Sequence, residues 1–113
     1  MNDENKADFG KIRPTLVPTQ IIRDIAEVRE YGLMKYPETG KEGWKEIDIE
    51  RIRDAMCRHL LAYLDNPQGL DEESGLSHLA HLACNCAFLC EMEANPKNVT
   101  DIEETPPSGY TFF

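Results

Sequence analysis

The stretch DEESGLSHLAHLACNCAFLCEM, residues 71–92, decides how this chain folds. Asp71 and Ser74 are predicted to accept hydrogen bonds from free backbone N–H groups in a short turn, where Gly75 lets the chain bend. From about Leu76 onward, apolar residues recur at helical spacing and spread around much of the cylinder. We therefore predict a helix over the rest of the stretch, buried nearly all round.

Three polar side chains share one stripe of this apolar helix. His78, His81 and Asn85 lie at i, i+3 and i+7, which places them on the same face. A buried polar group without a partner costs ~1–3 kcal/mol, so these side chains either satisfy one another and neighbouring helices or line a ligand site. A single histidine on an apolar helix is usually a hydrogen-bonded core residue. Two histidines one turn apart, with Glu73 just before the helix, favour a functional cluster.

The composition limits the class of protein. The chain has 113 residues, a formal net charge of −9 and 41% hydrophobic residues. This size suits one domain with a modest core, and pairing with further copies would add burial, so we expect a homodimer or homotetramer. The negative charge argues against general nucleic-acid binding. No apolar run reaches the ~18 residues of a membrane span and no signal-peptide pattern is present, so we expect no membrane partner and a cytoplasmic location.

The cysteines fit a reducing compartment. Cys84, Cys86 and Cys90 lie on one predicted helix, where disulfide geometry is poor, and Cys57 lies elsewhere. The sequence contains no CxxC pair. We predict that all four are small core residues.

The chain divides into three parts. Residues 1–9 are predicted to be a disordered lead-in, residues 10–93 a helical domain and residues 94–113 an extended tail. The domain begins with prolines that favour extended backbone and with the cations Lys11 and Arg13. This segment is either a strap with solvated charges or an arm that closes over an anionic ligand.

The first predicted helix covers residues 19–35. Asp24 and Glu27 share one face of this helix, and most such faces are simply solvated. Either carboxylate is also a secondary candidate for contact with a metal. Lys35 and Tyr36, at the end of the helix, are candidates for contact with a ligand. After them, Trp44 stands in a connector broken by glycines and is either a core plug or a stacking platform for a base.

The second predicted helix covers residues 48–64. Asp54 and Arg58 are four apart and form either a surface ion pair or part of a site. Arg58 and His59 are flanked by apolar residues, so at least one of them is expected to point inward. Because the connection to the next turn is short, the last two helices should be antiparallel neighbours. Arg58 and His59 should then meet His78 and His81, with Asp54 reaching toward His81 or Asn85.

Five motifs occur together in this order: GKIRPTLVP (10–18), YGLMKYP (31–37), GW (43–44), RDAMCRHLLAYL (53–64) and DEESGLSHLAHLACNCAFL (71–89). Through these motifs and their order, the chain resembles the phage and bacterial dATP/dGTP diphosphohydrolase domain, a branch of the MazG-like all-α nucleotide pyrophosphohydrolases. The resemblance implies a small helical bundle that oligomerises, binds Mg²⁺ or Mn²⁺ and cleaves a purine nucleoside triphosphate to its monophosphate and pyrophosphate. It places the protein in the cytosol of a bacterium or a phage-infected host.

The resemblance also implies site residues. The catalytic candidates are Asp54, His59, Glu73, His78 and His81. The candidates for substrate binding are Lys11, Arg13, Lys35, Tyr36, Trp44, Arg58, Ser74 and Asn85. The wider superfamily holds metal with carboxylates spaced ExxE and ExxD, whereas this chain has HxxH in its last helix. We therefore assign the metal to Asp54 and Glu73, with His78 or His81 completing the shell or acting as the base.

Two other interpretations remain open at this stage. The sparse carboxylates of the last helix suit a non-catalytic phage protein that sequesters a nucleotide. A purely structural helical oligomer with a satisfied polar core would bind no nucleotide at all.

Overall fold

The computed structural model describes residue 7 and residues 9–96, and in this part of the chain it contains helices and no strands. The α-helices are α1 (Gln20–Lys35), α2 (Ile49–Asp65) and α3 (His78–Ala94). Short 3-10 turns occupy Pro14–Leu16, Pro37–Thr39 and Gly43–Glu46. The all-α prediction is confirmed, and each α-helix boundary lies within two residues of its predicted position. Most of the predicted lead-in and tail falls outside the described residues.

Local side-chain chemistry explains where two helices begin. Asp48 accepts a hydrogen bond from the N–H of Glu50 at 3.1 Å and caps α2. Ser77 accepts one from the N–H of Ala80 at 3.0 Å and caps α3, two residues later than the predicted start. Helix α1 ends at Lys35, and the next residue, Tyr36, has non-helical backbone angles because Pro37 follows it.

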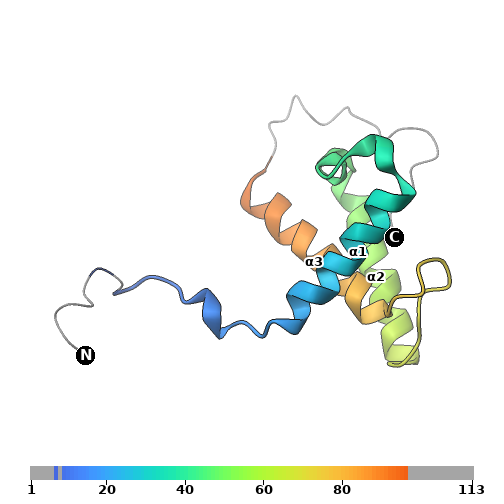
Figure 1. Cartoon of the computed structure of the whole chain (residues 1–113), viewed down its shortest axis with the longest axis horizontal. Helices are drawn as coiled ribbons and strands as arrows, with labels where there is room; N and C mark the ends of the chain where they lie inside the picture. The colour runs from blue at the N-terminus through green and yellow to red at the C-terminus, as the bar shows by residue number, and fades with distance from the viewer. Residues whose placement is uncertain (1–6, 8, 97–113) are drawn as a thin grey trace.

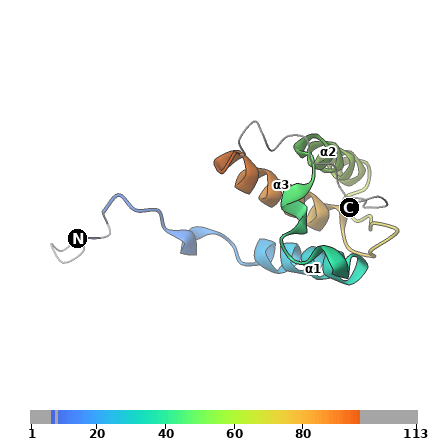
Figure 2. The same ribbon diagram turned by 90° about the horizontal axis from the view of Figure 1, so that it is seen from above.

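Helix α3 packs against both α1 and α2, as Figures 1 and 2 show from two directions. An ion pair between Arg53 and Glu93 joins the start of α2 to the end of α3 at 3.1 Å. The start of α3 lies beside the later half of α2, where His59 meets His78. These two contacts confirm the predicted antiparallel arrangement of the last two helices.

The core lies where these helices meet the connector between α1 and α2. Its buried members are Val28, Trp44, Ile47, Ile52, Ala80, Cys84 and Phe88. The Trp44 ring stacks on Phe88, with centroids 4.1 Å apart and an interplanar angle of 9°. Because Trp44 is only 9% exposed, the structure corrects its assignment as a platform for a base and supports the core-plug interpretation.

The prediction that α3 is buried nearly all round is wrong for a single chain. Its buried residues share one side, whereas Leu79 is 45% exposed and Cys86 and Cys90 are exposed. Two neighbouring helices cannot cover a whole cylinder, so the third side of α3 faces solvent. The prediction of core cysteines therefore holds for Cys84 but not for Cys86, Cys90 or Cys57, which is also exposed.

The segment before α1 stands apart from the three helices. Residues 9–19 are all exposed, and Figure 1 shows them extending away from the helical body. Phe9, Ile12 and Leu16 are among the most exposed large apolar side chains that the structure describes. None of the described helices combines the length and apolar character needed to cross a membrane.

Candidate functional site

The turn between α2 and α3 is held by the side chains of Asp71 and Ser74. Oδ2 of Asp71 accepts hydrogen bonds from the backbone N–H groups of Glu73 (3.1 Å) and Ser74 (2.9 Å). Oγ of Ser74 accepts one from the N–H of Leu76 at 3.1 Å. Gly75 adopts a φ of +75°, a left-handed conformation that a side chain would strain. Both predicted acceptor roles are confirmed, and the turn fixes the Asp71 carboxylate.

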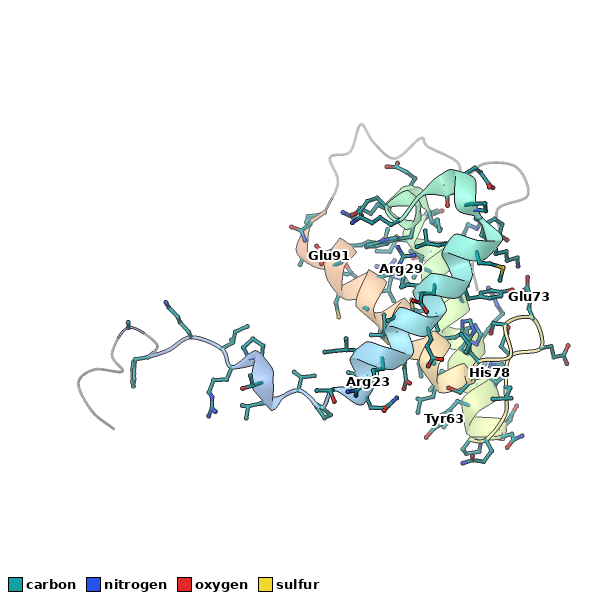
Figure 3. All side chains as sticks on the ribbon, viewed as in Figure 1. Arg23, Arg29, Tyr63, Glu73, His78 and Glu91 are labelled. Carbon is teal, nitrogen blue, oxygen red and sulfur yellow. The ribbon has the colours of Figure 1, made fainter. Side chains whose placement is uncertain are left out.

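Three histidines from α2 and α3 gather beside this turn. Nδ1 of His59 lies 2.9 Å from Nδ1 of His78. The ring of His59 also stacks on that of His81, with centroids 4.6 Å apart. Nε2 of His81 is 2.6 Å from Oγ of Ser74 and 4.0 Å from Oδ2 of Asp71. The predicted meeting of His59 with His78 and His81 is thus confirmed, and Figure 3 shows His78 beside the turn that carries Glu73.

Burial keeps the inner histidines uncharged. It lowers the pKa of His59 to about 4, and the nearby His81 contributes to the shift. Burial also lowers the pKa of His81, although the charge of Asp71 opposes that change. Partial burial raises the pKa of Asp71, but the Ser74 backbone hydrogen bond and His81 outweigh it, so the net pKa is lowered. At neutral pH the imidazoles of His59 and His81 are therefore neutral beside the ionised carboxylate of Asp71.

The end of α1 adds a cation and two phenol rings to the site. Lys35 forms an ion pair with Glu73 across the turn. Nζ of Lys35 also lies 5.3 Å from the ring centroid of Tyr36 and 6.0 Å from that of Tyr31. Burial, followed by the charge of Asp71, raises the pKa of Tyr31. The predicted ligand-contact residues Lys35 and Tyr36 therefore border the same cluster.

A metal-ligating arrangement is present among these side chains. His59, Asp71 and His78 each offer one donor atom, and the three atoms lie within 4.8 Å of one another. His59 is buried, whereas Asp71 and His78 are half-buried, so one side of the group faces solvent. Two imidazoles and a carboxylate are ordinary ligands for a divalent metal ion. The residues present therefore fit a metal.

Comparisons with known proteins identify the family of the chain. Residues 1–102 match the family model described as dATP/dGTP diphosphohydrolase, N-terminal. A dATP/dGTP diphosphohydrolase of Salmonella phage PMBT28 is 36% identical over 84 residues, which are 74% of this chain. The chain belongs to the dATP/dGTP diphosphohydrolase N-terminal family. The same alignment covers 28% of the phage relative, so the chain spans less than a third of that protein's length. No solved structure matches the chain.

In this family member, the predicted carboxylate Asp54 lies outside the histidine cluster. It precedes His59 by five positions, which corresponds to roughly 140° around an α-helix. Asp54 is exposed, whereas His81 and Asn85 are fully buried. The prediction that Asp54 reaches either of them is therefore wrong. Arg58 is also exposed, and His59 alone of the Arg58–His59 pair points inward.

Sequence reasoning did not assign Asp71 to the metal site. Its position before Ser74 and Gly75 identified it as a hydrogen-bond acceptor in the turn. Its availability as a candidate metal ligand was not considered. The available signal was a carboxylate seven residues before His78, with a tight turn that folds the chain back between them. Of the two carboxylates that the sequence favoured as metal ligands, Glu73 forms an ion pair with Lys35.

The other residues that were predicted to contact metal or phosphate lie on α1 and in the segment before it. Asp24 accepts a hydrogen bond from Gln20 at 2.9 Å near the start of α1, and Glu27 is exposed. Lys11 and Arg13 are exposed in the segment that extends away from the helices (Figure 2). Their contact with phosphate stays a prediction, which requires this segment to move or another copy to supply it.

Asn85 completes the polar stripe of α3 in an unusual way. The residue is fully buried, and neither its amide nitrogen nor its amide oxygen has a hydrogen-bond partner among the described residues. An amide in this state costs about 1–3 kcal/mol. The predicted substrate contact of Asn85 is not available in this conformation because the residue is fully buried.

Proposed function

We propose that this domain carries out the hydrolysis of purine deoxynucleoside triphosphates such as dATP and dGTP to the monophosphate and pyrophosphate. The cluster of His59, His78 and His81 beside the Asp71 carboxylate supports the proposal most directly. Membership of the family and the name of the phage relative, a dATP/dGTP diphosphohydrolase, support the substrate class. Lys35 beside the turn and the exposed Arg58 on α2 supply positive charge near this cluster in an otherwise acidic protein.

The reaction makes clear demands on the site. The oxygen of a water molecule bonds to the α-phosphorus, while the bond from that phosphorus to the oxygen bridging it to the β-phosphorus breaks. Pyrophosphate leaves with the bridging oxygen, and the proton of the water passes to a base. Of the predicted catalytic residues that border the cluster, Glu73 is exposed and His78 is half-buried, so both are accessible to substrate and water.

The chain's residues divide this work between them. Lys35 binds a phosphate oxygen, for which it would exchange its ion pair with Glu73 and thereby release that carboxylate. His81 is fully buried, so it acts as a positioning residue through the stacked His59 ring and the Ser74 hydroxyl. A bound divalent cation, predicted as Mg²⁺ or Mn²⁺, would neutralise charge on the triphosphate, and His59, Asp71 and His78 would hold it.

We further propose that a second copy covers the outer side of α2. Cys57, Leu60, Leu61 and Leu64 follow the spacing i, i+3, i+4 and i+7, and all four are exposed. Such spacing is typical of a helix face that packs on another helix. Since α1 and α3 do not cover this face, the predicted homodimer or homotetramer provides the occupant.

A product assay tests the proposed hydrolysis. Each deoxynucleoside triphosphate is incubated with the protein and Mg²⁺ or Mn²⁺, and the products are separated. We expect monophosphate and pyrophosphate, with purines preferred, and loss of turnover in His78→Gln but not in the control Asp65→Asn at the exposed end of α2. Release of orthophosphate, or no turnover, would contradict the proposal. Intact nucleotide retained in the presence of EDTA would instead identify a sequestering protein.

A further inference from the structure

We infer that His59, Asp71 and His78 form a site selective for a divalent transition-metal ion over Mg²⁺. The inference deepens the proposed function, because it names the class of cation that the hydrolysis would use. Its role in catalysis rests on that proposal, whereas binding of the ion alone does not. It replaces the sequence-based assignment of the metal to Asp54 and Glu73.

The distance between the two imidazoles is the first observation. Two ligand atoms at right angles on an ion with bonds of about 2.1 Å lie roughly 3.0 Å apart. Nδ1 of His59 and Nδ1 of His78 are 2.9 Å apart, so their present positions already match two adjacent ligands. The same distance suits a hydrogen bond between them when one Nδ1 carries a proton. When an ion binds, that histidine would carry its proton on Nε2 instead, which leaves the Nδ1 lone pairs of both rings for the metal.

The third ligand distinguishes a metal site from a simple histidine pair. The donor atom of Asp71 lies within 4.8 Å of both histidine donors. Its carboxylate is fixed by the backbone N–H groups of Glu73 and Ser74, so little side-chain freedom is lost when an ion binds. Three elements thus converge on one point: α2 provides His59, the turn provides Asp71 and α3 provides His78.

The surroundings also hold the innermost ligand in place. The His59 ring is 8% exposed and lies nearly parallel to the His81 ring, at an interplanar angle of 9°. His81 in turn is held by the Ser74 hydroxyl at 2.6 Å. Groups that orient a ligand from behind typically change metal affinity by about 10–100-fold when they are removed.

The donor types decide which ion the site prefers. Mg²⁺ is a hard cation that binds oxygen ligands and keeps several waters, so a site with two imidazoles suits it poorly. Imidazole nitrogen suits transition metals, whose affinities for a given nitrogen and oxygen set rise from Mn²⁺ through Co²⁺. An all-carboxylate site would discriminate much less between Mg²⁺ and Mn²⁺. The half-buried side of Asp71 and His78 leaves room for further ligands from water or phosphate.

Titration with the metal alone tests the inference. Metal-free protein is titrated with Co²⁺, Mn²⁺ or Mg²⁺ in the absence of nucleotide, while the visible absorption of Co²⁺ and the thermal midpoint are recorded. We expect one Co²⁺ per chain, weaker binding of Mn²⁺, and binding of Mg²⁺ at least about 100-fold weaker than that of Co²⁺. Asp71→Asn and His78→Gln should each weaken Co²⁺ binding by more than about 100-fold, beyond the loss caused by an outer-shell change.

Matched variants make the result decisive. Asp71→Asn retains an acceptor oxygen for the turn, and its midpoint in EDTA checks that it folds; His78→Gln provides a second test at a half-buried position. Asp54→Asn and Glu73→Gln should bind Co²⁺ as the unmodified protein does. Equal affinity for Mg²⁺ and Co²⁺, or loss of binding in Asp54→Asn with retention in Asp71→Asn, would overturn the inference. Because no nucleotide is present, selective metal binding without turnover would leave the inference standing and refute only the proposed hydrolysis.

Discussion

The imidazole rings of His59 and His81 lie face to face, 4.6 Å apart, although one comes from the middle of α2 and the other from α3. His81 is fully buried and touches the turn through Ser74, while His59 meets His78 on the accessible side. The stack therefore links the turn to the open side of the cluster. Any change that frees His81 should alter the orientation of His59.

Ser74→Ala tests this link. The substitution removes the hydroxyl beside His81 and should weaken Co²⁺ binding by about 10-fold or more, as loss of an outer-shell partner does. It should also lower the free energy of unfolding by about 1 kcal/mol. Glu72→Gln, an exposed change in the same turn, serves as the control and should alter neither quantity. Unchanged Co²⁺ affinity in Ser74→Ala would show that the stack needs no support from the turn.

Asn85→Leu should stabilise the protein. The amide is buried without a hydrogen-bond partner among the described residues, so an apolar side chain of similar size removes a desolvation cost of about 1–3 kcal/mol. Denaturant unfolding measures the difference, and Asn85→Asp should have the opposite effect because it buries a charge. A loss of stability in Asn85→Leu would reveal a partner for the amide, such as an ordered water.

The four thiols should differ sharply in reactivity. Burial raises the pKa of Cys84 to about 12, whereas Cys57, Cys86 and Cys90 are exposed. Because the thiolate is the reactive form, a disulfide reagent should modify three thiols of the dilute native protein and reach Cys84 only after unfolding. Mass spectrometry of the modified peptides identifies the sites. Rapid native modification of Cys84 would show that the core opens more readily than its packing indicates.

The double variant Leu61→Lys/Leu64→Lys should reduce self-association. Both residues are exposed on the outer side of α2, at 61% and 62%. Two charges at the proposed contact between copies would be costly to bury, so light scattering should report a smaller mass than for the unmodified chain. Met34→Lys, at an equally exposed apolar position on α1, is the matched control. An unmodified chain that is already monomeric would contradict the proposed second copy.

The sequence predicted the helices well because their signals are local. Apolar spacing and the turn chemistry of Asp71 and Ser74 act over a few residues, and the structure places them as expected. The resemblance to the family was likewise confirmed. The position of Trp44 depended on whether Phe88 lay nearby, which spacing along the chain cannot reveal.

The candidate site was only partly predictable for the same reason. The meeting of His59 with His78 and His81 was predicted from helix periodicity and from the short connection that makes the last two helices antiparallel. The choice between Asp54 and Asp71 depended on the rotation of α2 about its axis, and that rotation is fixed by packing of Ile52 and Ala55 in the core. Sequence reasoning assigned the metal to Asp54 and Glu73, whereas the turn brings a donor atom of Asp71 within 4.8 Å of those of His59 and His78.

The most direct test of the account is phosphorus NMR of the products formed from dGTP by the protein with Mn²⁺ in heavy-oxygen-labelled water, recorded after a chelating resin has removed the paramagnetic ion. The account predicts dGMP and pyrophosphate, with the heavy oxygen on dGMP, and a rate at least about 100-fold lower in Asp71→Asn than in the Asp65→Asn control. Orthophosphate with dGDP, or an undiminished rate in Asp71→Asn, would contradict it.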